Sequence, residues 1–326
     1  MSRIIPIFSV AILAIVVISA AQPAPFERTT SELDFQFCIT GFEHDSFFGE
    51  PSALALDDRN GLLYVADLKF GVSLFTSDGV PKEQLGIQSG IEKPVGLAVD
   101  SDGNLYVAND SGGPIRVIAK SGEVTEIEIP VEQGEEVPKV GRITFDRDGN
   151  LYLVDRAGCR IYVFDKNRKL KLKFGAKGDK RGQFKSLCDV AVDRQGRVYA
   201  LDASGTPVQV FDKKGKYLFK FGFRGGGLED IGIASGIFVD RHDQIWIVDK
   251  GQHCLKVFDR SGTFLRKLGV YGTEGGSFFQ PIDMEMDKFG RVYVAEAGGR
   301  RVQVFSLVKP YEPFQPADIG GDLLHP

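Results

Sequence analysis

One short pattern occurs six times along the chain, and this repetition constrains the fold more than any other feature of the sequence. Each copy is an alternating apolar stretch that ends in an aspartate, a short turn, and a second alternating stretch, as in RITFDRDGNLYLVD (142–155). The anchoring aspartates lie 43 to 47 residues apart, at Asp57, Asp100, Asp146, Asp193, Asp240 and Asp287. A regular period of this length is the signature of a repeat architecture.

The alternation inside each copy predicts a half-buried β-strand on either side of the turn. The turn usually reads D-x-x-G, so we expect the aspartate to bond the turn backbone and the glycine to have a positive φ, as at Gly149, Gly196 and Gly290. A third strand follows, such as VQVF (208–211), and after a second hairpin a fourth, such as KYLFKFG (216–222). Four antiparallel strands in about 45 residues are typical of one propeller blade.

The last copy lacks a fourth strand, and the start of the chain supplies a candidate for it. After VQVF (302–305) the sequence reads SLVKPYEPFQP, which has no hairpin glycine and contains three prolines that would interrupt a strand. LDFQFCI (33–39) alternates like a fourth strand but precedes the first copy. We therefore predict an all-β fold, a six-bladed β-propeller of four-stranded antiparallel blades over residues 32–309, in which the N-terminal strand closes the last blade.

The repeated units resemble NHL repeats. The resemblance rests on units such as GLAVDSDGNLYVAN (96–109) and on third strands followed by a hairpin, such as LKVFDRSG (255–262), and it covers residues 32 to about 309. It implies an exported, bacterial-type member of the NHL-repeat family of six-bladed propellers. NHL propellers include interaction modules, RNA-binding domains, sensor domains and a few lyases, so the resemblance implies a fold and leaves the function open.

The first residues are typical of an export signal. Arg3 precedes an apolar run over residues 4–18, and small residues follow, so residues 1–21 are interpreted as a signal peptide that is cleaved at its end. The alternative is an uncleaved anchor, because residues 4–21 just reach the length that spans a bilayer. Either interpretation places the propeller outside the cytoplasm, in a periplasm or secreted. The remaining segments are a linker and a proline-rich tail, residues 22–31 and 310–326.

The charge balance argues against nucleic-acid binding. The chain has 40 Lys and Arg against 44 Asp and Glu, whereas a nucleic-acid-binding protein normally presents a basic face. One basic run, KNRKLKLKFGAKGDKRGQFK (166–185), covers a predicted outermost strand. Its lysines fit either protection of an exposed sheet edge or docking on an anionic partner, a membrane surface or a cell-wall polymer.

The cysteines exclude several kinds of site. No two of them form a C-x-x-C motif, which excludes the usual metal, redox and haem motifs. In the repeat frame they belong to different blades. We therefore interpret them as buried free thiols rather than disulfides, at Cys38, Cys159, Cys188 and Cys254.

Polar residues recur where the predicted second strands end, on the face that carries the connections between blades. They form a ring of Asp67, Asn109, Asp155, Asp202, Asp249 and Glu296. Two interpretations are open: the carboxylates bond loop amides or an arginine of their own blade, or they line the mouth of the central channel and hold a cation or a basic ligand. The neighbouring loops vary in length and chemistry, and variable loops on a rigid scaffold are where recognition is usually built.

The sequence supports a catalytic function less than a binding function. The resemblance implies that a lyase of this kind would need several histidines at one zinc, and that a six-bladed lactonase would bind a cation through Glu, Asn and Asp from several blades. Of the four histidines, only His44 and His253 are expected to share a face, one short of the three protein ligands usual for catalytic zinc. We therefore assign no catalytic residue, no metal ligand and no cofactor.

We interpret the chain as an exported NHL-repeat propeller that acts as a binding or scaffold module for a protein, a peptide or a cell-envelope polymer. The alternative is a hydrolase or lyase of the lactonase or streptogramin-lyase type with a cation site at the channel mouth, and a third interpretation is a sensor domain of an envelope complex. Residues 4–21 also allow membrane association. The predicted binding residues are Asp67, Asp155, Arg156, Asp202, Asp249, His253, Glu296 and Arg300.

Overall fold

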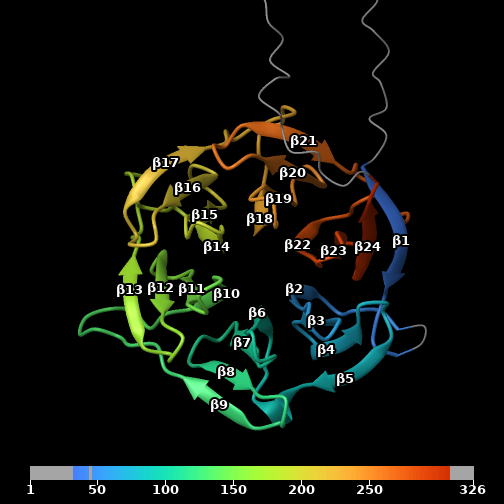
Figure 1. The fold of residues 1–326 in the computed structure, drawn as a ribbon, viewed down its shortest axis with the longest axis horizontal. Helices are drawn as coiled ribbons and strands as arrows, with labels where there is room; N and C mark the ends of the chain where they lie inside the picture. The colour runs from blue at the N-terminus through green and yellow to red at the C-terminus, as the bar shows by residue number, and fades with distance from the viewer. Residues whose placement is uncertain (1–31, 44–45, 309–326) are drawn as a thin grey trace, which may run out of the picture. The chain divides into compact units, whose positions relative to one another are not determined.

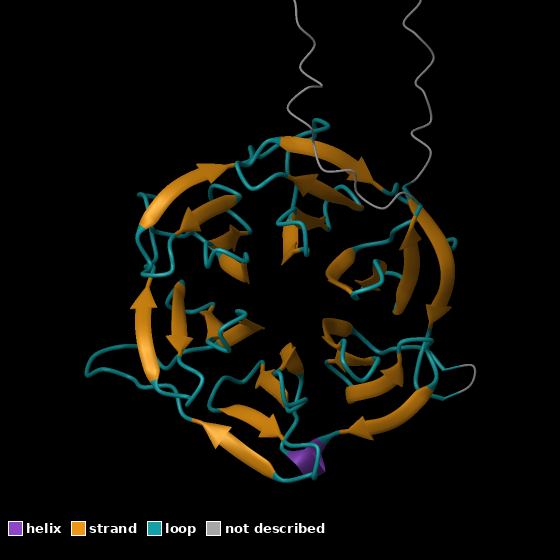
Figure 2. Ribbon diagram, in the orientation of Figure 1, coloured by secondary structure: helices purple, strands orange, loops and turns teal. Residues whose placement is uncertain are grey.

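In the computed structural model, residues 32–43 and 46–308 are described, and they form 24 β-strands. The strands are grouped into six four-stranded sheets around a central axis, like the blades of a propeller (Figures 1 and 2). Among the described residues, helical structure is limited to one short 3-10 turn, Ile87–Ser89, between the first two blades. The all-β six-bladed propeller predicted from the repeat is confirmed.

Each of the first five blades is built from one copy of the sequence repeat, and its strands follow the chain from the axis to the rim (Figure 1). Blade 1 contains β2 (Pro51–Asp57), β3 (Leu62–Asp67), β4 (Gly71–Thr76) and β5 (Pro81–Leu85). Blade 2 contains β6 (Pro94–Val99), β7 (Leu105–Asn109), β8 (Ile115–Ile118) and β9 (Val124–Ile127). Blade 3 contains β10 (Val140–Phe145), β11 (Leu151–Asp155), β12 (Arg160–Phe164) and β13 (Leu170–Phe174).

The remaining blades follow the same plan. Blade 4 contains β14 (Leu187–Val192), β15 (Val198–Asp202), β16 (Val208–Phe211) and β17 (Tyr217–Phe221). Blade 5 contains β18 (Ala234–Val239), β19 (Ile245–Asp249), β20 (Cys254–Phe258) and β21 (Phe264–Leu268). Blade 6 contains β22 (Pro281–Met286), β23 (Arg291–Glu296), β24 (Arg301–Leu307) and, at the rim, β1 (Leu33–Ile39).

The start of the chain completes the sixth blade. β1 pairs antiparallel with β24, with Leu33 opposite Leu307 and Ile39 opposite Val302. Leu33 is buried in the apolar cluster between blades 5 and 6, and Ile39 in the cluster between blades 6 and 1. The predicted closure of the ring by the N-terminal strand is therefore confirmed.

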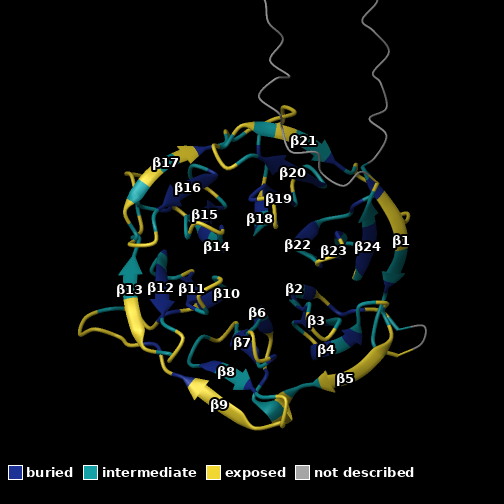
Figure 3. Ribbon diagram, viewed as in Figure 1, coloured by how far each residue is buried: buried dark blue, intermediate teal, exposed yellow. Residues whose placement is uncertain are grey.

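The apolar core lies between neighbouring blades. One cluster joins Tyr152 and Val154 of blade 3 to Val190 and Ala200 of blade 4. Because both faces of a blade pack against neighbours, the strands near the axis are buried on both sides, whereas the exposed residues that belong to strands lie on the rim strands (Figure 3). This packing explains why the second strands, such as LYLVD in β11, are apolar almost throughout and buried at every position.

The aspartates that anchor the repeat hold the hairpin turns. Asp146 Oδ1 accepts hydrogen bonds from the backbone N–H groups of Asp148 and Asn150, both at 2.9 Å. The aromatic residue of the second strand bonds the same kind of aspartate: Trp246 Nε1 donates to Asp240 Oδ2 at 3.0 Å. The predicted left-handed glycines are confirmed, with φ of 79°, 80° and 85° at Gly149, Gly196 and Gly290.

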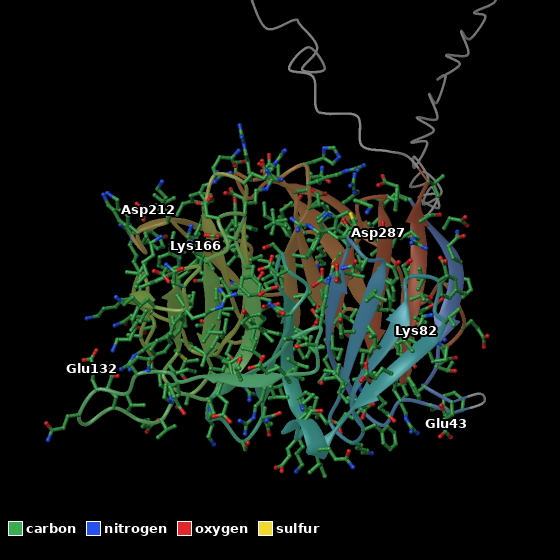
Figure 4. All side chains as sticks on the ribbon, turned by 60° about the horizontal axis from the view of Figure 1, so that its bottom comes forward. Glu43, Lys82, Glu132, Lys166, Asp212 and Asp287 are labelled. Atoms are coloured by element: carbon green, nitrogen blue, oxygen red, sulfur yellow. The ribbon has the colours of Figure 1, made fainter. Side chains whose placement is uncertain are left out.

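The propeller has two different faces. We call the face with the D-x-x-G turns the turn face, and the opposite face, with the connections between blades and between second and third strands, the ring face. Figure 4 shows Lys166 and Asp212, both in hairpin turns, on one side, and Glu43 and Glu132, both in connections, on the other.

Several predictions concern other parts of the chain. The predicted signal peptide, linker and tail, residues 1–21, 22–31 and 310–326, lie outside the described residues, as does His44. Within the part of the chain that the structure describes, no helix is both long and apolar enough to cross a membrane. The four cysteines are free thiols, as predicted, but only Cys159 and Cys254 are buried, whereas Cys38 and Cys188 are partly exposed.

Ring closure can be tested with two substitutions in β1. Ile39→Ala should lower the free energy of unfolding by about 2–5 kcal/mol, because it empties a buried site that joins β1 to blade 1. Gln36→Ala changes an exposed residue of the same strand and should cost less than about 1 kcal/mol. Urea unfolding followed by the fluorescence of the single tryptophan measures both. Equal losses would contradict this role of β1.

Candidate functional site at the central channel

The acidic residues predicted to mark a binding surface are buried. We call them the ring acids; each exposes at most 1% of its surface: Asp67, Asp155, Asp202, Asp249 and Glu296. Asp249 illustrates their contacts, because its Oδ2 accepts from Gly232 N at 2.7 Å and its Oδ1 from Gln252 N at 3.0 Å. These bonds tie the connection before blade 5 to the loop between β19 and β20. The ring acids therefore bond loop amides, the first of the two interpretations, and do not line the channel mouth.

The other three predicted binding residues separate into two groups. Arg156 lies at the channel mouth, where its Nη2 is 2.8 Å from Asp110 Oδ1. His253 Nδ1 accepts from Gln280 N at 3.0 Å, and Arg300 Nε donates to the carbonyl of Phe48 at 2.6 Å. Both of these contacts are with the connection into the next blade. The structure therefore places Arg156 at the mouth and the other two residues between blades.

The central channel contains a cluster of charged residues that the sequence analysis missed. It is a cavity of about 190 Å³ lined by the first strands of all six blades. Its ionisable side chains, which we call the channel cluster, are Arg142 of β10, Asp189 of β14, and Asp283 and Glu285 of β22. Arg142 Nη1 donates to Asp283 Oδ2 at 2.6 Å, and its Nη2 donates to the carbonyl of Ile282 at 3.0 Å. Since these residues belong to blades 3 and 6, the ion pair crosses the channel.

The channel cluster departs from the sequence repeat. Four positions before the turn aspartate, where Arg142, Asp189 and Asp283 stand, the other three blades have Ala53, Gly96 and Gly236. A small residue is required at Gly96, because a Cβ there would lie 1.9 Å from the carbonyl oxygen of Gly141. Charged residues four positions before the turn aspartate, where other blades have Gly or Ala, are the sequence signal that could have located this cluster.

Burial and mutual contact set the ionisation of these acids. Burial raises the pKa of Asp189 to about 7, although the Arg142 guanidinium opposes the shift. Burial also raises the pKa of Asp283, which accepts bonds from Arg142 and from Leu54 N at 2.7 Å. The pKa of Glu285 lies well above its usual value because of burial and the two neighbouring aspartates. One guanidinium thus faces three carboxyl groups, and at neutral pH they cannot all be charged.

The ring-face mouth of the channel is a second cavity, of about 280 Å³. Arg142 lines both the channel and the mouth. Arg156, which is paired with Asp110, and Lys250 add two further cations to the mouth, and the lining itself contains one acid, Glu50. Cys188 also lines it, but burial raises its thiol pKa and keeps it protonated. The mouth is therefore cationic and the channel below it acidic.

The residues of the channel do not fit the metal ion that the lactonase resemblance implies. Among residues 32–43 and 46–308, no group of three or more His, Cys, Asp or Glu side chains is placed to hold a metal. The carboxylates of the channel instead face the guanidinium of Arg142. We therefore derive no chemical step through a metal.

Comparison with known proteins identifies the fold. No protein-family model matches the chain, so the NHL assignment stays a prediction, and no curated protein matches it. Virginiamycin B lyase from Staphylococcus aureus has a similar structure, with a TM-score of 0.61 and 14% identity, over 84% of this chain and 99% of that chain. A gluconolactonase from Xanthomonas campestris gives a TM-score of 0.61 and 16% identity, over 85% and 88% of the two chains. A Bacteroides thetaiotaomicron protein of unknown function gives 0.62 and 18%, over 85% and 74%. At these identities the likeness establishes the six-bladed fold alone.

The raised pKa of Asp189 predicts a pH-dependent stability. The folded protein holds this proton up to about pH 7, whereas an unfolded aspartate loses it near pH 4. The stabilisation from Asp189 is therefore complete below about pH 4 and is lost as the pH rises to about 7. Urea unfolding between pH 4 and 8 should show a smaller decline of stability with pH for Asp189→Asn than for the wild type. Asp102→Asn, at an exposed turn, should leave the decline unchanged; parallel curves for Asp189→Asn and the wild type would contradict the assignment.

Proposed function

We propose that the chain is a propeller hydrolase or lyase of the lactonase or streptogramin-lyase type, with its site at the ring-face mouth of the central channel. The substrate class is a small ester or lactone that also carries an anionic group. The observation that carries the proposal is the channel cluster, where charged residues replace the small residues of the repeat beneath a cationic mouth. Lyase and gluconolactonase names among the structures of similar fold support the reaction class.

The proposed chemistry uses general base catalysis and a fixed cation. Asp189, with a pKa of about 7, is divided between its charged and neutral forms near neutral pH, which suits a group that both accepts and returns a proton. Arg142 lines both the channel that contains Asp189 and the mouth, and it supplies N–H donors for an oxygen that gains negative charge. Arg156 and Lys250 provide cations for the anionic group of the substrate.

Ester hydrolysis at this site would have two steps, addition of water and loss of the leaving oxygen. Water gives a proton to the Asp189 carboxylate while its oxygen adds to the carbonyl carbon, and the oxyanion that forms is stabilised by Arg142. The C–O bond to the leaving oxygen then breaks, and that oxygen takes the proton back from Asp189. The products are a carboxylic acid and an alcohol, which stay in one molecule when the substrate is a lactone.

A binding module remains the second candidate. The cationic mouth formed by Arg142, Arg156 and Lys250 favours a carboxylate-bearing ligand, such as the end of a peptide or an envelope polymer, whether or not turnover follows. Under this candidate the channel cluster orients Arg142 through its pair with Asp283. Export from the cytoplasm, proposed from residues 1–21, would place the site in contact with envelope components.

Proton release from a panel of lactones, measured on the full chain by pH-stat with and without added divalent cations, tests the enzyme proposal. Asp189→Asn should lower kcat by about 100-fold or more, the usual contribution of a general base. Arg156→Gln should mainly raise KM. Lys214→Gln, at an exposed position of the turn face, is the control and should leave both unchanged.

The two candidates give different results. Turnover that persists in Asp189→Asn would contradict the assigned base. No turnover by the wild type, together with calorimetric binding of peptide carboxylates that Arg156→Gln weakens, would favour the binding module. A wild type that neither turns over lactones nor binds carboxylates would exclude this site for both.

A further inference from the structure

Another cavity of the ring face lies over blade 4 and is separate from the channel and its mouth. It is a groove of about 640 Å³, and no residue of the channel or its mouth lines it. Three segments form it: residues 178–185 of the connection into blade 4, the β15–β16 loop at 204–207, and residues 220–224 at the end of β17.

The groove is lined by unneutralised cations. Lys180, Arg181, Lys185 and Lys220 are all exposed. No carboxylate oxygen of the described residues lies within the 4.0 Å of an ion pair from the three lysine ammonium groups. Of the two acids in the lining, Asp202 already accepts backbone N–H bonds, including those of Lys185 and Ser186 at 2.8 and 3.0 Å. The groove therefore presents a net positive charge to solvent.

Blade 6 contains the same local structure and serves as an internal comparison. In blade 4, Gln209 Oε1 accepts from Gly182 N at 2.9 Å, and its Nε2 donates to the carbonyl of Gln183. In blade 6, Gln303 Oε1 accepts from Gly276 N, also at 2.9 Å, and its Nε2 donates to the carbonyl of Ser277. The two connections are thus held in the same way.

One sequence difference between these blades bears on the open groove of blade 4. In blade 6 the guanidinium of Arg301 reaches its connection and donates to the carbonyls of Thr273, at 2.7 Å, and Glu274, at 3.0 Å. The corresponding residue of blade 4 is Pro207, which has no side-chain donor and lines the groove. Lys180 also stands where blade 6 has Glu274, so the charge of the connection is reversed.

The two halves of the basic run at residues 166–185 differ in their contacts. On the rim strand β13, Lys173 is neutralised by Glu132 at 2.7 Å and Glu135 at 3.0 Å. Beyond β13, Lys180 and Lys185 have no such partners and line the groove, whereas Lys177 is not part of its lining. Edge protection and internal pairing therefore explain the first half of the run, and the second half needs another explanation.

We propose that this groove binds an acidic oligosaccharide that carries carboxylate or sulfate groups along its chain. Lys180 and Lys185 on the connection and Lys220 on β17 offer cations from separate segments, as a ligand with repeated oxyanions requires. Ser204 and Thr206 in the lining add hydroxyl groups for hydrogen bonds. Phe223 is 80% exposed in the same lining and offers an apolar ring face to a sugar. This mixture of cations, hydroxyls and one exposed ring fits a sugar acid better than a purely apolar ligand.

The test uses calorimetry on the full chain with four probes of six units each: a sulfated heparin-derived hexasaccharide, a hexagalacturonate, neutral maltohexaose and a hexaglutamate peptide. We expect one or both acidic sugars to bind in a salt-sensitive way and the neutral probe not to bind. Replacing Lys180, Lys185 and Lys220 by Gln should weaken binding by about tenfold or more, as the loss of several exposed ion pairs implies. The matched control replaces Lys166, Lys213 and Lys214 of the turn face by Gln and should change binding by less than about twofold, because the lost charge is the same but distant.

Pro207→Arg separates a shaped groove from a general attraction of charge. This substitution adds a cation, yet it should weaken binding, because the new guanidinium would fill the groove as Arg301 does in blade 6. Unchanged melting temperatures of all variants would show that they fold.

Four outcomes would overturn the proposal. They are no binding of either acidic sugar, equal weakening by the two triple variants, tighter binding by Pro207→Arg, and tighter binding of the hexaglutamate peptide than of both acidic sugars. Lactone turnover that is retained by the groove variants would show that this site and the channel mouth are independent.

Discussion

The pairing of β1 with β24 is the contact on which the rest of the propeller depends. Each blade buries its two faces only against its neighbours, so an incomplete sixth blade would leave apolar surface of blades 1 and 5 exposed. Closure also defines the axis. Arg142 and Asp283 come from opposite blades and lie 2.6 Å apart only because all six first strands surround one channel.

Polar residues that recur in every blade and residues that differ between blades have different roles in this chain. The repeated polar residues hold the backbone: the turn aspartates bond hairpin amides, and ring acids such as Asp249 join the connection before their blade to the loop between its second and third strands. The channel cluster lies where the repeat is broken, because Arg142, Asp189 and Asp283 replace small residues at the axis. The blade 4 groove lies beside a position that varies between blades and is Pro207 in blade 4 and Arg301 in blade 6. A repeated scaffold thus acquires chemistry at positions where its blades differ.

The two sites are open to the same face but have different surroundings. In the channel, carboxyl groups are packed around one guanidinium and burial raises their pKa values. In the blade 4 groove the lysines are exposed and keep their hydration. A ligand of the first site must enter a confined space, whereas a chain molecule can lie along the second without either end being enclosed.

The sequence by itself determined the blade number, the strand order within each blade, the closing strand and the left-handed glycines. These features follow from local periodicity and turn chemistry, which act over a few residues and repeat six times. It left open whether the ring acids face a ligand or the loops, because burial depends on neighbours that are distant along the chain. It placed His253 and Arg300 correctly on the ring-face loops, but only the packing of blades 5, 6 and 1 decided that they contact the next blade. The channel cluster belongs wholly to the tertiary structure: Arg142 and Asp283 are 141 residues apart in sequence, and ring closure brings them into contact across the axis.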